Sequence, residues 1–247
     1  MSDQQIGVVG AGTMGQGIAQ VVAASGFNVR LYDVAEEQLG RAKANIDKGL
    51  GKLVTKEKIS EADKSAALAR LSTTTALNAL SDCAIIIEAA PEQPELKERV
   101  VGMHFFNPVP VLKLVEVIRA EQTSDATVTE IETLAKALGK TAVLVGDAPG
   151  FAVNRLLVPM INEAAFIVQE GTATPEAVDS AMKLGAAHPM GPLALADLIG
   201  LDVCLAIMEV LQEGFGDPKY RPCPLLKRMV AAGYLGRKSG RGFYHYD

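Results

Sequence analysis

The sequence predicts an α/β fold, in which a doubly wound, mostly parallel sheet is followed by an all-helical C-terminal domain. A glycine-rich turn lies between a β-branched run and an apolar helical pattern near the N-terminus. Further short apolar runs alternate with helical patterns, and strand patterns disappear beyond Phe151. Such alternation is typical of α/β folds. We therefore expect domains at residues 1–147 and 148–247.

The first unit reads as strand, turn, helix, strand and acid. Residues 6–9 are a short β-branched run, and Gly10-Ala11-Gly12-Thr13-Met14-Gly15 follows at once. Residues 18–23 give an apolar helix surface that ends at Ser25-Gly26. Residues 27–32 read as the second strand, which Asp33 closes.

This order predicts a Rossmann-type NAD site. Gly10 permits the tight turn, Gly12 leaves room for the pyrophosphate, and Gly15 lets helix and strand pack closely. The Asp33 carboxylate can accept from the ribose hydroxyls and would repel a 2′-phosphate, which favours NAD over NADP. The alternative is a glycine-rich turn without a ligand. The residues expected to bind the cofactor here are Gly10, Gly12, Thr13, Met14, Gly15 and Asp33.

Residues 36–53 and 57–70 read as two helices. Lys48, Lys52 and Lys56 are spaced by four residues, which places them on one helix face if the first helix continues. A ligand that carries phosphates could use this face. The alternative is an ordinary solvated surface, since exposed lysines need no special role.

Four short runs are candidate strands: residues 71–74, 84–88, 100–103 and 114–118. His104 ends the third run, where open α/β sheets place ligand chemistry, and Glu116 lies inside the fourth. An imidazole, with an unperturbed pKa of about 6.5, exchanges protons near neutral pH. His104 and Glu116 are therefore a candidate acid/base pair. The alternative is a structural histidine and an unrelated glutamate.

Composition excludes several classes of function. The 24 Lys+Arg against 29 Asp+Glu give a net charge of −5, so neither nucleic acid nor an anionic membrane is an expected partner. The three cysteines have no metal-like spacing and no disulfide framework. No basic leader and no membrane-length apolar stretch are present. We expect a cytoplasmic protein.

The second domain should be built from helices alone. The candidate helices are residues 151–170, 175–184, 192–213 and 222–232. The first is apolar nearly all round, which requires burial against several partners. A second subunit could supply that burial in a homodimer. Burial within one chain is the alternative.

At this point five segments together resemble a known family. They are GAGTMGQGIAQ at 10–20, VVGMHFFNPVPVLKLVEVI at 100–118, GDAPGFAVNRLL at 146–157, HPMGPLALADLIGLD at 188–202 and GRKSGRGFYHYD at 236–247. The chain resembles bacterial short-chain 3-hydroxyacyl-CoA dehydrogenases, most closely the 3-hydroxybutyryl-CoA dehydrogenases, nearly from end to end.

The resemblance implies NAD-dependent oxidation of short-chain (S)-3-hydroxyacyl-CoA and the reverse reduction. It implies that His104 and Glu116 form the catalytic dyad and that Asn154 contacts the substrate near its thioester carbonyl. Glu92 and Lys97 match positions that contact the nicotinamide half of NAD. Two further residues, Lys52 and Lys56, match positions that hold CoA phosphates. The resemblance also implies a homodimer through the helical domain.

One segment of the family pattern is absent. In the family, a helix, a strand that ends in S-N-T-S and a short linker helix lie between E-L-K and the R-V-x-G-M-H-F-F-N-P segment. Here Glu95-Leu96-Lys97 runs directly into residues 98–104, and S-N-T-S occurs nowhere. Only residues 89–99 separate two candidate strands, near the lower limit for a parallel crossover. We hypothesise that residues 100–103 move into the vacated place beside residues 85–88, which would shift His104 by about 4.8 Å, one strand spacing.

Three functional hypotheses follow. The first is an active NAD-dependent 3-hydroxyacyl-CoA dehydrogenase. The second is an NAD-binding variant or relic of this family that is catalytically impaired by the lost segment. The third is a related dehydrogenase of small hydroxy acids, which is disfavoured because such enzymes usually rely on a lysine base, whereas this chain has HFFNP.

Overall fold

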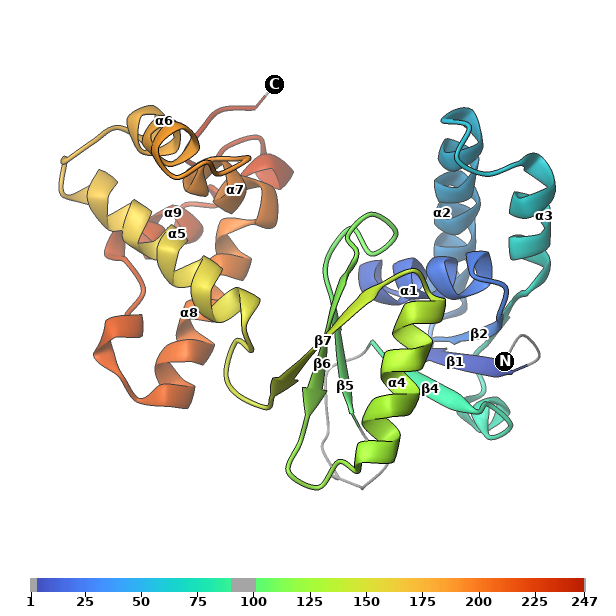
Figure 1. Ribbon diagram of the computed structural model, residues 1–247. Coiled ribbons are helices and arrows are strands. Elements are labelled where there is room, and N and C mark those ends of the chain that lie inside the picture. Colours follow the sequence, from blue (N-terminus) through green and yellow to red (C-terminus); the bar gives the residue numbers. More distant parts are fainter. Residues whose placement is uncertain (1–3, 90–100, 247) are drawn as a thin grey trace. The chain divides into compact units, whose positions relative to one another are not determined.

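The computed structural model describes residues 4–89 and 101–246. The chain divides into two compact units, Met1–Gly146 and Asp147–Asp247, which we call the N-terminal unit and the helical unit. Figure 1 shows strands and helices in the first unit and helices in the second. No helix among the described residues is long and apolar enough to cross a membrane.

The N-terminal unit begins with a four-stranded, fully parallel sheet in the order β3-β2-β1-β4. Its strands are β1 (Gln5–Val9), β2 (Asn28–Tyr32), β3 (Leu71–Thr74) and β4 (Ile85–Glu88). The helices that connect them are α1 (Thr13–Ala24), α2 (Glu36–Thr55), α3 (Glu61–Ala69) and the 3₁₀ turn η1 (Leu77–Leu80). This is the strand order of a Rossmann half, so the expected parallel α/β fold is confirmed.

A second, three-stranded sheet completes this unit. Its order is β5 (Gly102–Phe105), β6 (Leu114–Arg119), β7 (Thr141–Gly146), with β5 antiparallel and β7 parallel to β6. Helix α4 (Asp125–Ala137) begins at Ser124, whose side chain accepts from the amide of Thr127, and packs on β6 and β7 (Figure 1). Side chains of both sheets meet in one hydrophobic core, so the unit is continuous although its sheets are separate.

The hypothesis that the strand before His104 moves beside β4 is wrong. Within residues 4–89 and 101–246, β4 pairs with β1 and β5 pairs with β6, and no pairing joins β4 to β5. β5 and β6 are consecutive strands joined by a short loop, and such strands commonly pair with each other, so β5 has a partner without β4. His104 thus lies opposite Glu116 on β6.

The helical unit contains five α-helices within its described residues. They are α5 (Val153–Gln169), α6 (Pro175–Gly185), α7 (Pro192–Ile199), α8 (Leu201–Phe215) and α9 (Pro224–Ala231), with 3₁₀ turns η2 (Pro218–Tyr220) and η3 (Arg237–Ser239). Helices α5, α7, α8 and α9 enclose its main core. The apolar helix α5 buries Val158 and Ile161 there but leaves Leu156 77% exposed.

The prediction of one helix over residues 192–213 is wrong at its centre. Gly200 has φ of 109° and both ends α7 and begins α8. Residues with a side chain rarely adopt this conformation. An apolar periodicity that continues on both sides of a glycine cannot reveal such a break.

Candidate active site

The glycine turn has the geometry of a dinucleotide site. Gly10 has φ of 92°, and a Cβ at Gly15 would lie 1.7 Å from the carbonyl oxygen of Gly10, so neither position accepts a side chain without rearrangement. A Cβ at Gly12 would meet nothing within 4 Å. Gly12 also caps α1 without a side-chain hydrogen bond, and the first turn of α1 carries no acidic residue. The helix N-terminus and the space beside it therefore fit a pyrophosphate.

Asp33 lies beside this turn at the carboxyl end of β2. Its Oδ2 accepts from the amide of Ala11 at 2.8 Å, and its Oδ1 accepts from the amide of Ala35 at 3.0 Å. These bonds hold the carboxylate against the glycine turn, where a ribose would follow the pyrophosphate. Of the other two residues expected at the turn, Thr13 is exposed and Met14 packs partly against the core.

A pocket of about 380 Å³ lies between the carboxyl end of β3 and the first turns of α2. Its lining residues are Glu36, Leu39, Gly40, Lys43, Thr73, Thr74 and Thr75. This pocket was not predicted from the sequence. The run of three threonines at the end of a candidate strand was the available signal, because ligands bind at the carboxyl ends of parallel strands.

His104 and Glu116 form the pair that the sequence predicted. They are directly opposed on the antiparallel strands β5 and β6, so their side chains share one face. His104 Nδ1 lies 2.8 Å from Glu116 Oε2. An ionised carboxylate only accepts, so the N–H is assigned to Nδ1, and the lone pair of the neutral ring lies on Nε2.

The two members of the pair differ in exposure. The side chain of Glu116 is 1% exposed, whereas that of His104 is 28% exposed. The ring of Phe106 lies 4.6 Å from the His104 ring, centroid to centroid. A buried carboxylate thus orients an imidazole that is partly exposed to solvent, an arrangement that suits proton transfer.

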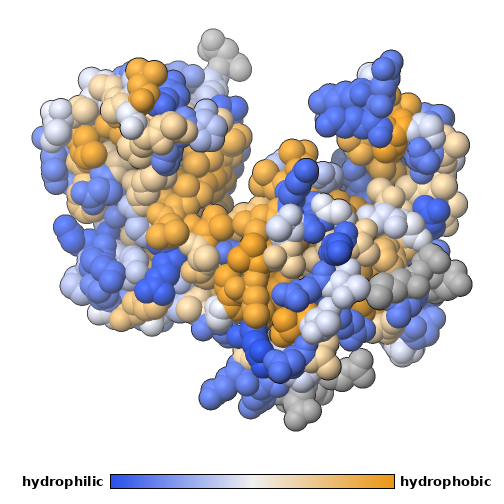
Figure 2. Space-filling model, viewed as in Figure 1, coloured by the Kyte–Doolittle hydropathy of each residue, from blue (hydrophilic) through white to orange (hydrophobic). Residues whose placement is uncertain are grey.

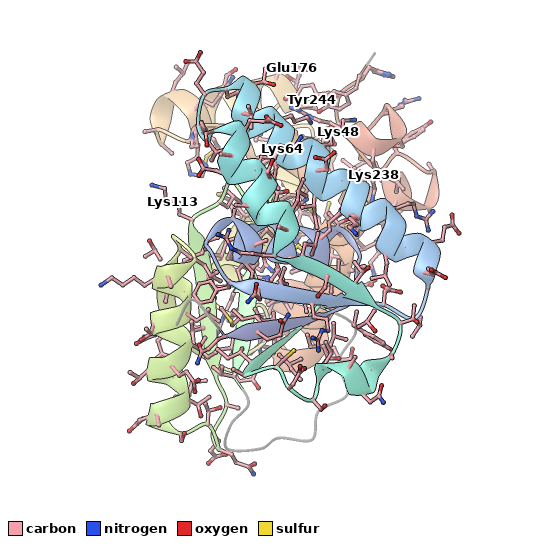
Figure 3. The ribbon with its side chains drawn as sticks, turned by 90° about the vertical axis from the view of Figure 1, so that its right-hand side faces the viewer. Lys48, Lys64, Lys113, Glu176, Lys238 and Tyr244 are labelled. Carbon is pink, nitrogen blue, oxygen red and sulfur yellow. The ribbon has the colours of Figure 1, made fainter. Side chains whose placement is uncertain are left out.

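Two lysines of the predicted face lie near the end of α2. Lys52 is exposed in its last turn, and Lys56 is exposed at the C-cap, so the helix ends before it reaches Lys56. The labelled Lys48 lies on α2 and Lys64 on the neighbouring α3 (Figure 3). Lys64 is paired with Asp47 at 2.9 Å, so it differs from the exposed lysines of α2.

Asn154 lies in the helical unit, in the first turn of α5. It lines an apolar pocket of about 610 Å³ with the junction segment 147–151 and with Ile207, Val210, Glu213 and Gly214. The structure thus brings the glycine turn to Asp33, and His104 to Glu116. Asn154 belongs to the other unit, and Glu92 and Lys97 lie outside the described residues.

Comparisons with known proteins identify the family. The family model for the NAD binding domain of 3-hydroxyacyl-CoA dehydrogenase matches residues 5–101 and 97–148. The model for the C-terminal domain matches residues 150–246. Together these matches account for nearly the whole chain.

Individual relatives agree with this match. A probable 3-hydroxybutyryl-CoA dehydrogenase of Deinococcus radiodurans is 49% identical over 278 residues, covering 98% of this chain and 100% of the relative. One from Bacillus subtilis is 48% identical over 283 residues, covering 100% and 99%. The crystal structure of (S)-3-hydroxybutyryl-CoA dehydrogenase PaaH1 from Ralstonia eutropha superposes with a TM-score of 0.94 at 47% identity, with 99% of each chain covered. With its NAD-binding fold and its opposed histidine and glutamate, the chain belongs to the 3-hydroxyacyl-CoA dehydrogenase family.

Proposed function

We propose that this protein catalyses the NAD-dependent oxidation of short-chain (S)-3-hydroxyacyl-CoA, such as 3-hydroxybutyryl-CoA, to 3-ketoacyl-CoA, and the reverse reduction. The observation that carries the proposal is the hydrogen-bonded pair His104–Glu116, in a unit that matches the family's NAD-binding domain. Two relatives at 48–49% identity are described as probable 3-hydroxybutyryl-CoA dehydrogenases, which supports the choice of substrate.

The chemistry of this reaction needs one proton and one hydride. In oxidation, Nε2 of His104 takes the proton of the 3-hydroxyl, and NAD, when bound, would supply the acceptor for the hydride of C3. In reduction, protonated His104 returns the proton to the 3-keto oxygen. Glu116 stabilises the imidazolium in both directions and holds the ring through Nδ1.

Other residues take supporting roles in this proposal. Asn154 contacts the substrate near the thioester carbonyl, and Glu92 and Lys97 contact the nicotinamide half of NAD. Lys52 and Lys56 hold the CoA phosphates, since both are exposed cations. Replacing both lysines with alanine should raise the KM for acetoacetyl-CoA about tenfold and leave the Kd for NADH unchanged. An equal loss of NADH affinity would contradict this assignment.

The direct test is NADH oxidation by acetoacetyl-CoA with purified protein, followed by absorbance. His104→Ala should abolish turnover and retain NADH binding. His245→Ala is the matched control, because His245 is an exposed histidine of the helical unit. Turnover that survives His104→Ala would refute the assigned role.

The NAD site has its own test, which needs no turnover. Gly12→Ala adds a methyl group where no protein atom lies within 4 Å, so folding should be unaffected. The same methyl group would meet the pyrophosphate, so the Kd for NADH should rise at least about tenfold. Unchanged NADH affinity would place the cofactor elsewhere.

A second candidate is an NAD-binding variant whose catalysis is impaired. In the described part of the chain the sheet is interrupted between β4 and β5. The alignments with relatives also extend over 278 and 283 residues, more than the 247 of this chain. Saturable NADH binding without turnover would favour this candidate over the active enzyme.

We further propose a cytoplasmic homodimer that associates through the helical unit. Apolar side chains remain exposed on this unit, including Leu156, Leu198 and Val210, and Figure 2 shows such apolar areas in orange. The three free cysteines suit a reducing compartment. Light scattering should give twice the chain mass, and Leu156→Glu should weaken association. A monomeric wild type would refute the dimer.

A further inference from the structure

The loop that joins β5 to β6 connects the catalytic pair to the rest of the N-terminal unit. It comprises residues 106–113 and turns on itself, because the amides of Val111 and Leu112 both donate to the carbonyl of Pro108. Its first residue, Phe106, is the ring in contact with His104. A displacement of this loop would therefore move the imidazole of His104 through its contact with Phe106.

One side of the loop rests on the dinucleotide helix. Val109 is 2% exposed, and a Cβ placed on Gly17 of α1 would lie only 2.9 Å from the Cβ of Val109. The absence of a side chain at Gly17 thus lets the loop contact α1 directly. This contact links the half that carries His104 to the half that carries the glycine turn.

The other side of the loop is held by Lys140, the residue before β7. Its ammonium donates to the carbonyl oxygens of Val109 and Leu112, the second bond measuring 2.7 Å. Burial lowers the pKa of Lys140, as desolvation does for an ammonium. Among the described residues, Lys140 forms no ion pair, and its ammonium is held by the two carbonyl oxygens.

We propose that Lys140 is a positioning residue for the reaction: with Gly17 it clamps the 106–113 loop and thereby sets the position of His104 relative to the dinucleotide turn. The clamp matters in this chain because its two sheets share no hydrogen-bonded strands within the described residues. The docked loop supplies a rigid link that a continuous sheet would otherwise provide. The effect on turnover rests on the proposed dehydrogenase function, whereas the effect on His104 does not.

The test compares Lys140→Met, which keeps the side-chain length but loses the donors, with Lys140→Arg, which keeps a cation with several donors. Lys113→Met is the matched control, because Lys113 is an exposed lysine of the same loop that points away from the ribbon (Figure 3). The readouts are kcat with acetoacetyl-CoA, the Kd for NADH and the histidine ring signals in NMR.

The chain has three histidines, so the ring spectrum is simple to assign. In Lys140→Met we expect kcat to fall about 10- to 100-fold, as for a misplaced catalytic group, with the NADH Kd within about threefold of wild type. The His104 signal should shift, while His188 and His245 in the helical unit should not. Lys140→Arg should restore both kcat and the signal, and Lys113→Met should change neither.

An unmoved His104 signal in Lys140→Met would overturn the proposal, and so would an equal effect of Lys113→Met. If wild type shows no turnover, the proposed function fails, and the His104 signal still decides on the clamp. If Lys140→Met does not fold, Gly17→Ala tests the opposite anchor, because its methyl group must push Val109 away. Gly17→Ala should then shift the His104 signal, and no shift would overturn the proposal.

Discussion

Glu116→Gln isolates the effect of the carboxylate charge in the His104–Glu116 pair. Glutamine has the size of glutamate, and the side chain is 1% exposed, so the packing around it should persist. What is lost is the negative charge on the acceptor of the 2.8 Å hydrogen bond from His104 Nδ1, because the carbonyl oxygen of glutamine can still accept. Hydrogen bonds to charged groups contribute roughly 1.5–3 kcal/mol and neutral ones roughly 0.5–1.5 kcal/mol, so the loss is roughly 1–1.5 kcal/mol. Since this energy stabilises the protonated imidazole, kcat should fall roughly 5- to 15-fold, because about 1.4 kcal/mol is a factor of ten.

The assay is steady-state turnover with acetoacetyl-CoA and NADH, together with NADH binding by fluorescence. The Kd for NADH and the melting temperature should stay close to wild type, because the substitution neither removes volume nor touches the glycine turn. Glu121→Gln, at an exposed position just beyond β6, is the matched control and should be silent. A kcat within threefold of wild type would refute the reasoning, as would a loss of activity explained by weaker NADH binding.

Three further predictions concern stability. Gly15→Ala should impair both folding and NADH binding, because its Cβ would lie 1.7 Å from a carbonyl oxygen of the same turn; a normal melting temperature would contradict this. Asn162→Ala should lower the free energy of unfolding by about 2–3 kcal/mol in urea denaturation, since the buried amide of Cys223 loses the 2.7 Å bond to the Asn162 side chain; a change below about 0.5 kcal/mol would refute it. The pKa of Asp202 is lowered from 3.8 by its hydrogen bond with Lys238, so the ionised carboxylate stabilises the folded state. This stabilisation is present above pH 3.8 and is lost as the pH falls below it. Asp202→Asn should therefore cost at most about 1 kcal/mol at pH 7, and the difference in the free energy of unfolding should shrink as the pH falls below 3.8; a difference that stays constant through that fall would show another cause.

Local sequence was sufficient where a site is built from neighbouring residues. The glycine turn and the acid after β2 were predicted from spacing alone, because one strand, one helix and the next strand specify that geometry. The position of His104 at the end of a strand also suggested its role. Its pairing with Glu116, by contrast, was only one of two interpretations of the sequence. The structure decided between them, because the two residues are opposed on β5 and β6 and His104 Nδ1 lies 2.8 Å from Glu116 Oε2.

Features that depend on contacts between distant segments were missed or wrong. The break at Gly200 is hidden in an apolar periodicity that runs through it. The hypothesis placed β5 beside β4, whereas the two strands lie in different sheets. The sequence shows that their connection is short, but it does not show with which strand each of them pairs. The contacts of Lys140 with a loop about 30 residues earlier leave no local pattern at all.

The sequence by itself determined the class of fold and the place of the dinucleotide turn, and it marked His104 and Glu116 as candidates for proton transfer, since each follows from local conformational preference and side-chain chemistry. Only the tertiary structure decided which strands pair, how the loop after His104 is held, and which polar pocket forms beyond β3. These features depend on the packing of elements that lie far apart in the chain. Their arrangement is the one that gives the whole folded chain its lowest free energy, and no single segment specifies it.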